Sequence, residues 1–219
     1  MKILQKVCFV LLLTTFSSVY GGDCFKDKDV DDCREKAEQG IPLAQSVLGY
    51  MYNEGIGVPQ DYKEAVKWYR LAAEQGDSSA QYNLGLNFYK GEGVLQDYKE
   101  AVKWYRLAAE QGIPLAQFNL GFMYDHGQGV RQDYKEAFKW TRKSAEQGDP
   151  KAQYKLGLIY ALGKGVHKDY VMAHMYFNIA AVSGSKEVVD NRGLLEKMMT
   201  PSQIEKGQDL AREWMRTHQ

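Results

Sequence analysis

Apolar residues recur along this chain with the spacing of helical faces. Two series lie close together, the first made of Ala80, Leu84, Gly85 and Phe88 and the second of Ala101, Trp104, Ala108 and Ala109. Each series keeps to one side of a helix with about 3.6 residues per turn. A Gly-Glu-Gly sequence at 91–93 separates them, and glycine ends helices because it takes positive φ without steric cost. The pattern predicts two antiparallel helices joined by a short loop.

Residues that cap helices stand where the predicted helices begin. Asp97 precedes the second helix and Glu100 follows three residues later, a capping-box arrangement that satisfies otherwise unpaired amides. The same pair recurs as Asp61 with Glu64 and as Asp133 with Glu136. Asp149 followed by Pro150 predicts the start of a helix of the first kind, because proline suits the first helical position.

The helical hairpin recurs with a period of 36 residues. The sequence Ala-Glu-Gln-Gly occurs at 37–40, 73–76, 109–112 and 145–148. This divides the chain into four full repeats at 41–76, 77–112, 113–148 and 149–184, an N-terminal capping half-repeat at 23–40 and C-terminal capping helices at 185–219. Because no hairpin buries its apolar faces alone, the repeats must stack on one another. The predicted fold is an all-α solenoid of stacked antiparallel helix hairpins.

The repeat unit resembles a known family. Its columns read A-Q-x-x-L-G-x-x-Y/F-x-x-G-x-G-V-x-x-D-Y-x-x-A-x-x-W-x-x-x-A-A-E-Q-G, and residues 116–124 are a clear instance. This pattern is similar to the Sel-one-like repeat, a relative of the tetratricopeptide hairpin, over about residues 30–184. The resemblance implies an α-solenoid that serves as an adaptor or scaffold, often in bacterial envelopes and often without catalysis. Tyr176 replaces the tryptophan of the earlier repeats, which is typical of the end of a stack.

The first 22 residues have the order of a secretory signal peptide. Lys2 and Lys6 precede an apolar run at 7–13, and small or neutral residues follow up to Gly22. The apolar part is shorter than the roughly 20 residues that a membrane-spanning helix needs. We expect cleavage near Gly21 and a periplasmic or secreted protein, with an uncleaved anchor as the alternative. No later segment is apolar enough to span a membrane.

The two cysteines that remain after signal cleavage are expected to form a disulfide. Cys8 leaves with the signal, so Cys24 and Cys33 are an even pair in a compartment where disulfides persist. A continuous helix between them would hold the two sulfurs too far apart. Residue 24 must therefore fold back as part of a loop.

Charge and composition narrow the range of functions. Lys and Arg total 28, and Asp and Glu total 28, so no net field attracts nucleic acid or an anionic membrane. The 44% hydrophobic content suits a folded globular chain rather than a disordered one. Neither observation favours one protein partner over another.

Few residues have a pattern that indicates catalysis, a cofactor or a metal. Ser183 and Lys186 form the S-x-x-K of serine acylases, but the supporting S-D-N and K-T-G elements are absent and the match falls on a repeat turn. The four histidines, at 126, 167, 174 and 218, do not cluster in sequence, and no H-E-x-x-H is present. We predict no catalytic residue, no cofactor and no metal, with an envelope hydrolase of β-lactamase type as an alternative.

What remains is a variable surface on the first helix of each repeat. By its resemblance to tetratricopeptide stacks, this face is expected to line a concave groove that binds a protein or peptide. Binding of peptidoglycan or another glycan by the aromatic residues is a further alternative. The predicted binding residues are Tyr50, Asn53, Glu54, Leu86, Tyr89, Lys90, Phe122, Asp125, His126, Leu158 and Leu162. Their neighbours one turn earlier, Ser46, Tyr82, Phe118 and Tyr154, either join this face or pack between hairpins.

Overall fold

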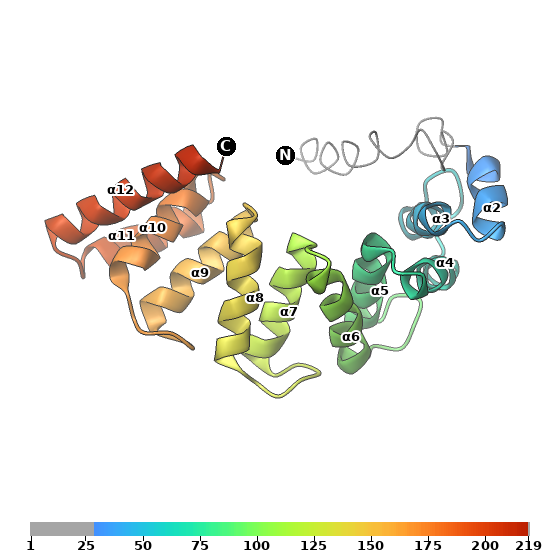
Figure 1. Ribbon diagram of the computed structural model, residues 1–219, viewed down its shortest axis with the longest axis horizontal. Helices are drawn as coiled ribbons and strands as arrows, with labels where there is room; N and C mark the ends of the chain where they lie inside the picture. The colour runs from blue at the N-terminus through green and yellow to red at the C-terminus, as the bar shows by residue number, and fades with distance from the viewer. Residues whose placement is uncertain (1–28, 219) are drawn as a thin grey trace. The chain divides into compact units, whose positions relative to one another are not determined.

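The computed structural model describes residues 29–218, and over this range all regular structure is helical (Figure 1). The signal segment predicted at 1–22 lies outside the described residues. Within them, no helix is both long and apolar enough to cross a bilayer. The described residues form two compact units that divide between Asp97 and Tyr98. Each unit is described below by itself.

The described part of unit 1, residues 29–97, contains four helices. They are α2 (Val30–Glu38), α3 (Pro42–Glu54), α4 (Tyr62–Glu74) and α5 (Ser78–Lys90). Each helix packs on the next one along the chain, and α3 also contacts α5. Helix α2 packs on α3 in the place that a second helix of a preceding repeat would take.

Unit 2 contains the other seven helices of the described range. They are α6 (Tyr98–Glu110), α7 (Pro114–His126), α8 (Tyr134–Glu146), α9 (Pro150–Leu162), α10 (Tyr170–Ala181), α11 (Lys186–Glu196) and α12 (Pro201–Thr217). Successive helices pack together from α6 to α10, and α10 then contacts both α11 and α12. The fold class predicted from the sequence, an α-solenoid of helical hairpins, is confirmed.

The core lies where the repeat pattern places it. Leu48, Leu84, Leu120 and Leu156 occupy one column of the repeat, and all four have no exposed surface. The second helices contribute alanines and bulky aromatics, among them Trp104 and Trp140, each 5% exposed. Burial of this apolar surface is the main force that holds each hairpin on its neighbour.

The expected helix caps are present, in part with a different partner. The Asp61 carboxylate accepts bonds from the amides of Lys63 and Glu64 at 2.8 and 3.1 Å, so it caps α4. The Glu64 side chain contacts Lys67 instead of completing a capping box. A reciprocal capping box occurs at the start of α12, between Thr200 and Gln203.

A set of glutamines in one column of the repeat ties consecutive hairpins together. Gln45, Gln81, Gln117 and Gln153 are each 4% exposed. Their amides donate to the carbonyls of Ala37, Ala73, Ala109 and Ala145 at 3.1, 3.1, 3.1 and 3.3 Å. A buried amide must find a partner, and here that partner belongs to the preceding hairpin. The glutamine of the Ala-Glu-Gln-Gly sequence extends the set, as Gln147 donates to Gln117 at 2.7 Å.

The glycine pairs of the loops are structural, as the sequence indicated. Gly127 ends α7 in the left-handed region with a φ of 66°. Gly129 has a φ of 68°, and a Cβ atom there would lie 2.2 Å from the carbonyl oxygen of Tyr98. The second glycine of the pair therefore lets the loop lie directly on the start of an earlier helix.

The C-terminal cap differs from a simple continuation of the repeat. At Gly157 a Cβ atom would come within 2.6 Å of the Phe177 ring, whereas at Gly193, which occupies the same column, nothing lies within 4 Å. Gly207 of α12 makes the close approach instead, with its Cβ position 2.6 Å from His174 Nδ1. Helix α12 thus packs closely on α10. Its Ala211 is buried in the hydrophobic cluster that contains Tyr176 and Ile179 of α10, and Trp214 is partly buried against that cluster.

Buried tyrosines predict a loss of stability at alkaline pH. Burial raises the pKa of Tyr176 to about 12 from an ordinary value of 10.0, and burial also raises the pKa of Tyr69 strongly. Between about pH 10 and pH 12, Tyr176 loses its phenol proton in the unfolded chain and keeps it in the folded chain. The stability that these tyrosines contribute is therefore complete below about pH 10 and falls as the pH rises, by about 2 kcal/mol for Tyr176 near pH 12.

Urea unfolding at neutral and alkaline pH measures this effect. Tyr176→Phe should reduce the fall in unfolding free energy between the two conditions, whereas Tyr134→Phe, at an exposed tyrosine, should leave it unchanged. An equal fall in both variants and in the unmodified protein would contradict the role assigned to Tyr176.

Candidate protein-interaction surface

The first helices of consecutive repeats lie side by side within each unit. In unit 1 the amide of Asn87 on α5 lies 3.5 Å from the Asn53 side-chain oxygen on α3. In unit 2 the Lys155 ammonium on α9 lies 2.7 Å from an Asp125 carboxylate oxygen on α7. We call the predicted binding residues on α3 and α5, and those on α7 and α9, the first-helix face.

Glutamine side chains from the following loops hold the ends of these helices. Gln60, Gln96 and Gln132 donate to the carbonyls of Asn53, Tyr89 and Asp125 at 2.7, 2.8 and 2.7 Å. A helix leaves its last carbonyls without intrahelical partners, and these amides satisfy one of them in each of the first three repeats. The backbone that positions the first-helix face is therefore fixed by the loop.

In unit 1 the first-helix face combines half-buried aromatic and apolar residues with exposed charges. Tyr50, Leu86 and Tyr89 are half-buried. Burial raises the pKa of Tyr50, and the nearby Glu54 carboxylate raises it further. Glu54 and Lys90 are exposed, and the Glu54 carboxylate accepts a bond from the Asn53 amide at 2.8 Å.

In unit 2 the face carries an aromatic pair and two leucines. The rings of Phe122 and His126 stack with their centroids 4.0 Å apart. The His126 ring also binds the Phe122 carbonyl through Nδ1 at 2.9 Å, which makes Nδ1 the protonated nitrogen. Leu158 is half-buried, while Leu162 at the end of α9 is 60% exposed. This arrangement presents a preformed aromatic surface beside exposed apolar area.

Asp125 differs from the other predicted binding residues because it is buried. Its side chain is 5% exposed, and its carboxylate pairs with Lys155. One carboxylate oxygen, Oδ1, has no hydrogen-bond partner among the described residues. We therefore assign Asp125 to the contact between α7 and α9 and leave it out of the accessible surface. The signal that sequence reasoning missed is Lys155, the one charge in a column otherwise occupied by Val47, Asn83 and Asn119.

The residues one turn earlier pack between hairpins. Ser46 is buried, and Phe118 packs against the cluster that contains Leu156 and Ile179. The Tyr154 hydroxyl donates to Glu187 at 2.8 Å and accepts from Asn191 at 2.8 Å, both on α11. The sequence left open whether this column joins the binding face or packs between hairpins. Ser46, Phe118 and Tyr154 pack between hairpins.

The S-x-x-K residues have local partners in the structure. The Ser183 hydroxyl donates to the Ala180 carbonyl at 2.7 Å, and the Lys186 ammonium lies 2.5 Å from Asp190. Gly184 between them turns the chain with a φ of 75°. The serine is thus bonded within its own turn rather than to the lysine that would activate it.

The histidines have separate surroundings. His174 is fully buried, and its Nε2 lies 2.9 Å from a Glu196 carboxylate oxygen. His218 stacks on Trp214, with the ring centroids 4.2 Å apart. Within residues 29–218 no group of three or more His, Cys, Asp or Glu side chains is placed to hold a metal ion.

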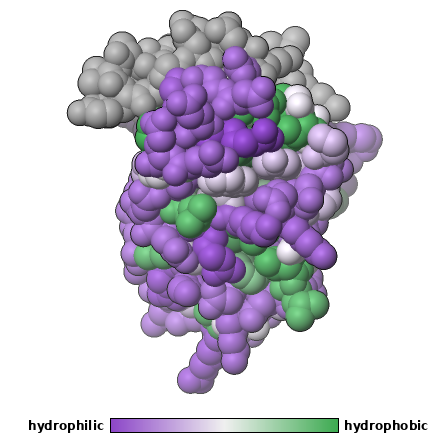
Figure 2. Space-filling model, turned by 90° about the vertical axis from the view of Figure 1, so that its right-hand side faces the viewer, coloured by the Kyte–Doolittle hydropathy of each residue, from purple (hydrophilic) through white to green (hydrophobic). Residues whose placement is uncertain are grey.

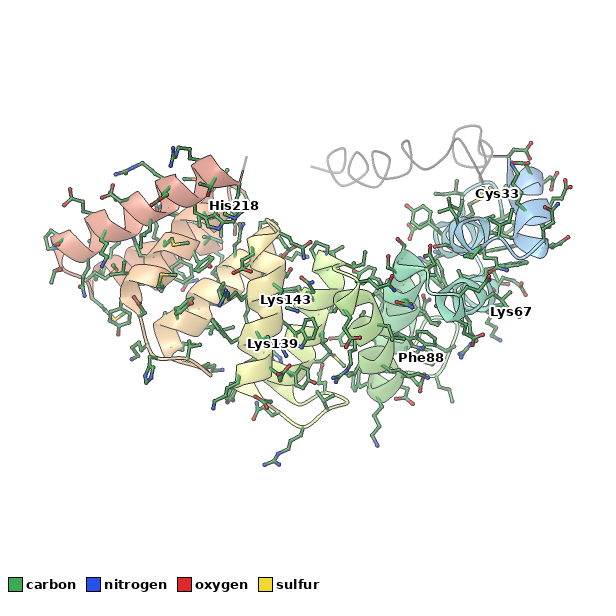
Figure 3. All side chains as sticks on the ribbon, in the orientation of Figure 1. Cys33, Lys67, Phe88, Lys139, Lys143 and His218 are labelled. Atoms are coloured by element: carbon green, nitrogen blue, oxygen red, sulfur yellow. The ribbon has the colours of Figure 1, made fainter. Side chains whose placement is uncertain are left out.

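Cys33 lies in the N-terminal cap on α2 (Figure 3). It has no exposed surface and packs with Val47 and Met51. Cys24 lies outside the described residues, so the disulfide between the two cysteines stays a prediction.

Stacked hairpins with a variable face on their first helices define a helical repeat protein of the protein-interaction class. The Sel1 repeat matches residues 42–77, 78–113, 114–149 and 150–185, one residue later than the repeats drawn from the period. The chain therefore belongs to the Sel1 repeat family. Proteins of this family are generally scaffolds for protein interaction and generally non-enzymatic.

Two solved structures are similar to the chain. One is c5321, described as a protective antigen present in uropathogenic Escherichia coli strains displaying an SLR fold, with 39% identity and a TM-score of 0.79 over 86% of this chain. Our chain spans 41% of the length of that protein. The other is a Sel1 repeat protein from Oxalobacter formigenes, with 40% identity and a TM-score of 0.69, covering 76% of this chain and 68% of that one. Among curated proteins, none matches the chain.

Proposed function

We propose that the protein is an exported, non-enzymatic adaptor of the bacterial envelope that binds a protein or peptide on its first-helix face. The observation that carries this proposal is the set of aromatic and apolar side chains that remain partly exposed there. The stacked Phe122–His126 pair is part of it. In a helical repeat, residues that neither pack between hairpins nor hold the backbone are available to a partner.

The composition of the face supports recognition of protein. Tyrosine, phenylalanine and leucine supply large contact areas, and the charged residues Glu54 and Lys90 stand at the helix ends. Binding energy at protein interfaces is concentrated in a few such aromatic residues. The columns that build the fold are repeated in all units, while the residues of this face differ from one repeat to the next.

Export rests on the N-terminal sequence. The charged, apolar and small-residue order of residues 1–22 supports cleavage and a periplasmic or secreted location. The similar Escherichia coli protein is described as a protective antigen, which is compatible with a location that immune effectors can reach.

Affinity capture from an envelope extract tests the proposal. The mature chain is compared with a Tyr89→Ala, Phe122→Ala double variant. We expect the double variant to bind a captured protein at least ~10-fold more weakly, because loss of an aromatic hot spot typically costs about 2 kcal/mol.

A matched control removes two apolar side chains from other surfaces. Leu95 is 91% exposed and Val182 is 76% exposed, so a Leu95→Ala, Val182→Ala variant should capture the same protein as the unmodified chain. Both variants must melt at the temperature of the unmodified chain. Equal capture by the two variants would show that the first-helix face is not the binding surface.

A further inference from the structure

The two units carry opposite net charges, although the whole chain is neutral. Residues 29–97 contain 12 acidic and 6 basic residues, for a net charge of −6. Residues 98–218 contain 18 basic and 14 acidic residues, for a net charge of +4. A charge difference between parts of one chain directs each part toward different partners.

Part of the positive charge of unit 2 lies in its loops. The loops at 127–133 and 163–169 have the same paired glycines with positive φ as those at 55–61 and 91–97. The residues at matching positions differ, however: Arg131 replaces Pro59 and Leu95, Lys164 replaces Ile56 and Glu92, and Lys168 replaces Gln60 and Gln96. Because the loops of unit 1 adopt this conformation without these cations, the cations are not needed for the fold.

Packing places the 163–169 loop against the start of α8, where Lys135 lies and which Arg131 precedes by three residues. A Cβ atom on Gly165 would lie 2.2 Å from the Tyr134 carbonyl and 2.9 Å from the Lys135 amide, so the second loop lies directly on the start of α8. The Lys164 ammonium lies 5.2 Å from the centre of the Tyr134 ring. The connections α7–α8 and α9–α10 both lie along the lower edge of this unit in Figure 1. We call Arg131, Lys135, Lys164 and Lys168 the basic edge.

All four cations of the basic edge are exposed, and none takes part in an ion pair within residues 29–218. The acidic residues nearest in sequence are already engaged. The Asp133 carboxylate accepts from the amides of Lys135 and Glu136, and Asp169 accepts from the Met172 amide. Glu136 in turn pairs with Lys139, at 3.1 Å. The four cations outnumber the two carboxylates in residues 127–135 and 163–169, so these segments keep a net charge of +2.

We propose that the basic edge binds an acidic polypeptide segment of a partner protein. The basic edge shares no residue with the first-helix face, so the proposal does not depend on binding there. A short acidic segment is complementary in charge to the exposed cations of the edge. The exposed Tyr134 ring, 37% accessible between the cations, adds apolar contact that a polypeptide uses better than a phosphate surface does.

Figure 2 shows the side of unit 1 that lies to the right in Figure 1. This face of unit 1 is mostly hydrophilic, with hydrophobic residues in separated groups. Where charges select the partner, affinity falls as salt is added. Dissolved ions screen the attraction between exposed charges that are more than roughly 10 Å apart.

Fluorescence anisotropy with a labelled oligoglutamate peptide tests the proposal, with an oligoglutamine peptide of equal length as the probe control. The mature chain should bind oligoglutamate at low salt and lose affinity as salt rises. An Arg131→Gln, Lys135→Gln, Lys164→Gln, Lys168→Gln variant should bind it ~10-fold or more weakly. The matched control is Lys151→Gln, Lys197→Gln, Lys206→Gln, Arg216→Gln, which removes the same charge from exposed positions elsewhere in unit 2.

The outcomes separate the possibilities. Weaker binding by the first variant alone supports the basic edge as the site. Equal weakening in both variants would show an effect of net charge only, and absence of binding by the unmodified chain would overturn the proposal directly. Tighter, edge-dependent binding to anionic vesicles or duplex DNA than to the peptide would assign the edge to another class of partner. Circular dichroism checks that the variants fold. Two double variants, Arg131→Gln with Lys135→Gln and Lys164→Gln with Lys168→Gln, provide the same comparison with fewer changes.

Discussion

Gly129→Ala is expected to lower the free energy of unfolding by about 2–5 kcal/mol. The φ of 68° at this position already disfavours a side chain, at a cost of about 1–2 kcal/mol. The added Cβ would also lie 2.2 Å from the Tyr98 carbonyl oxygen and 2.4 Å from its carbon. Backbone atoms cannot move aside as a flexible side chain would, so the loop or α6 has to shift, which costs about 1–3 kcal/mol more.

A second glycine separates the two contributions. Gly148 has a φ of 90°, but nothing lies within 4 Å of its Cβ position. Gly148→Ala should therefore show only the conformational cost, about 1–2 kcal/mol. Urea unfolding of the two variants, followed by circular dichroism, measures the difference. If both variants lost the same stability, the contact between the 127–133 loop and the start of α6 would not contribute.

The fold could be predicted from the sequence because one unit is repeated. A single 36-residue pattern fixed the hairpin, the buried leucine column and the capping aspartates, and each of these could be checked against its own copies. The prediction was weaker where the pattern changes. Gly193 keeps its column but lacks the close contact that Gly157 makes with the following helix, because α12 packs on α10 through Gly207. Nothing in the local sequence of α11 indicates that the helix after it packs on α10.

The candidate site was harder to predict, because exposure depends on the neighbouring repeat. Asp125 varies between repeats in the same way as Tyr89, yet it is buried by its pairing with Lys155, 30 residues further along. Column variability alone does not distinguish an exposed residue from one that contacts the next hairpin. The buried glutamines of the repeat, unlike Asp125, are the same in every repeat. Their constancy marked them as part of the repeat, but only the structure shows that they donate to the preceding hairpin.

Leu84→Ala is expected to lower the free energy of unfolding by about 2–5 kcal/mol, because it removes a fully buried side chain and leaves a cavity. Each hairpin of a repeat protein depends on contact with its neighbours, so this loss should weaken unit 1 beyond the hairpin that contains Leu84. Leu95→Ala is the matched control, since that leucine is 91% exposed and its removal should change stability by less than about 0.5 kcal/mol. Thermal and urea unfolding of the two variants measures the difference. Similar stability in both would contradict the assignment of Leu84 to the core, and with it the stacking of hairpins through the leucine column.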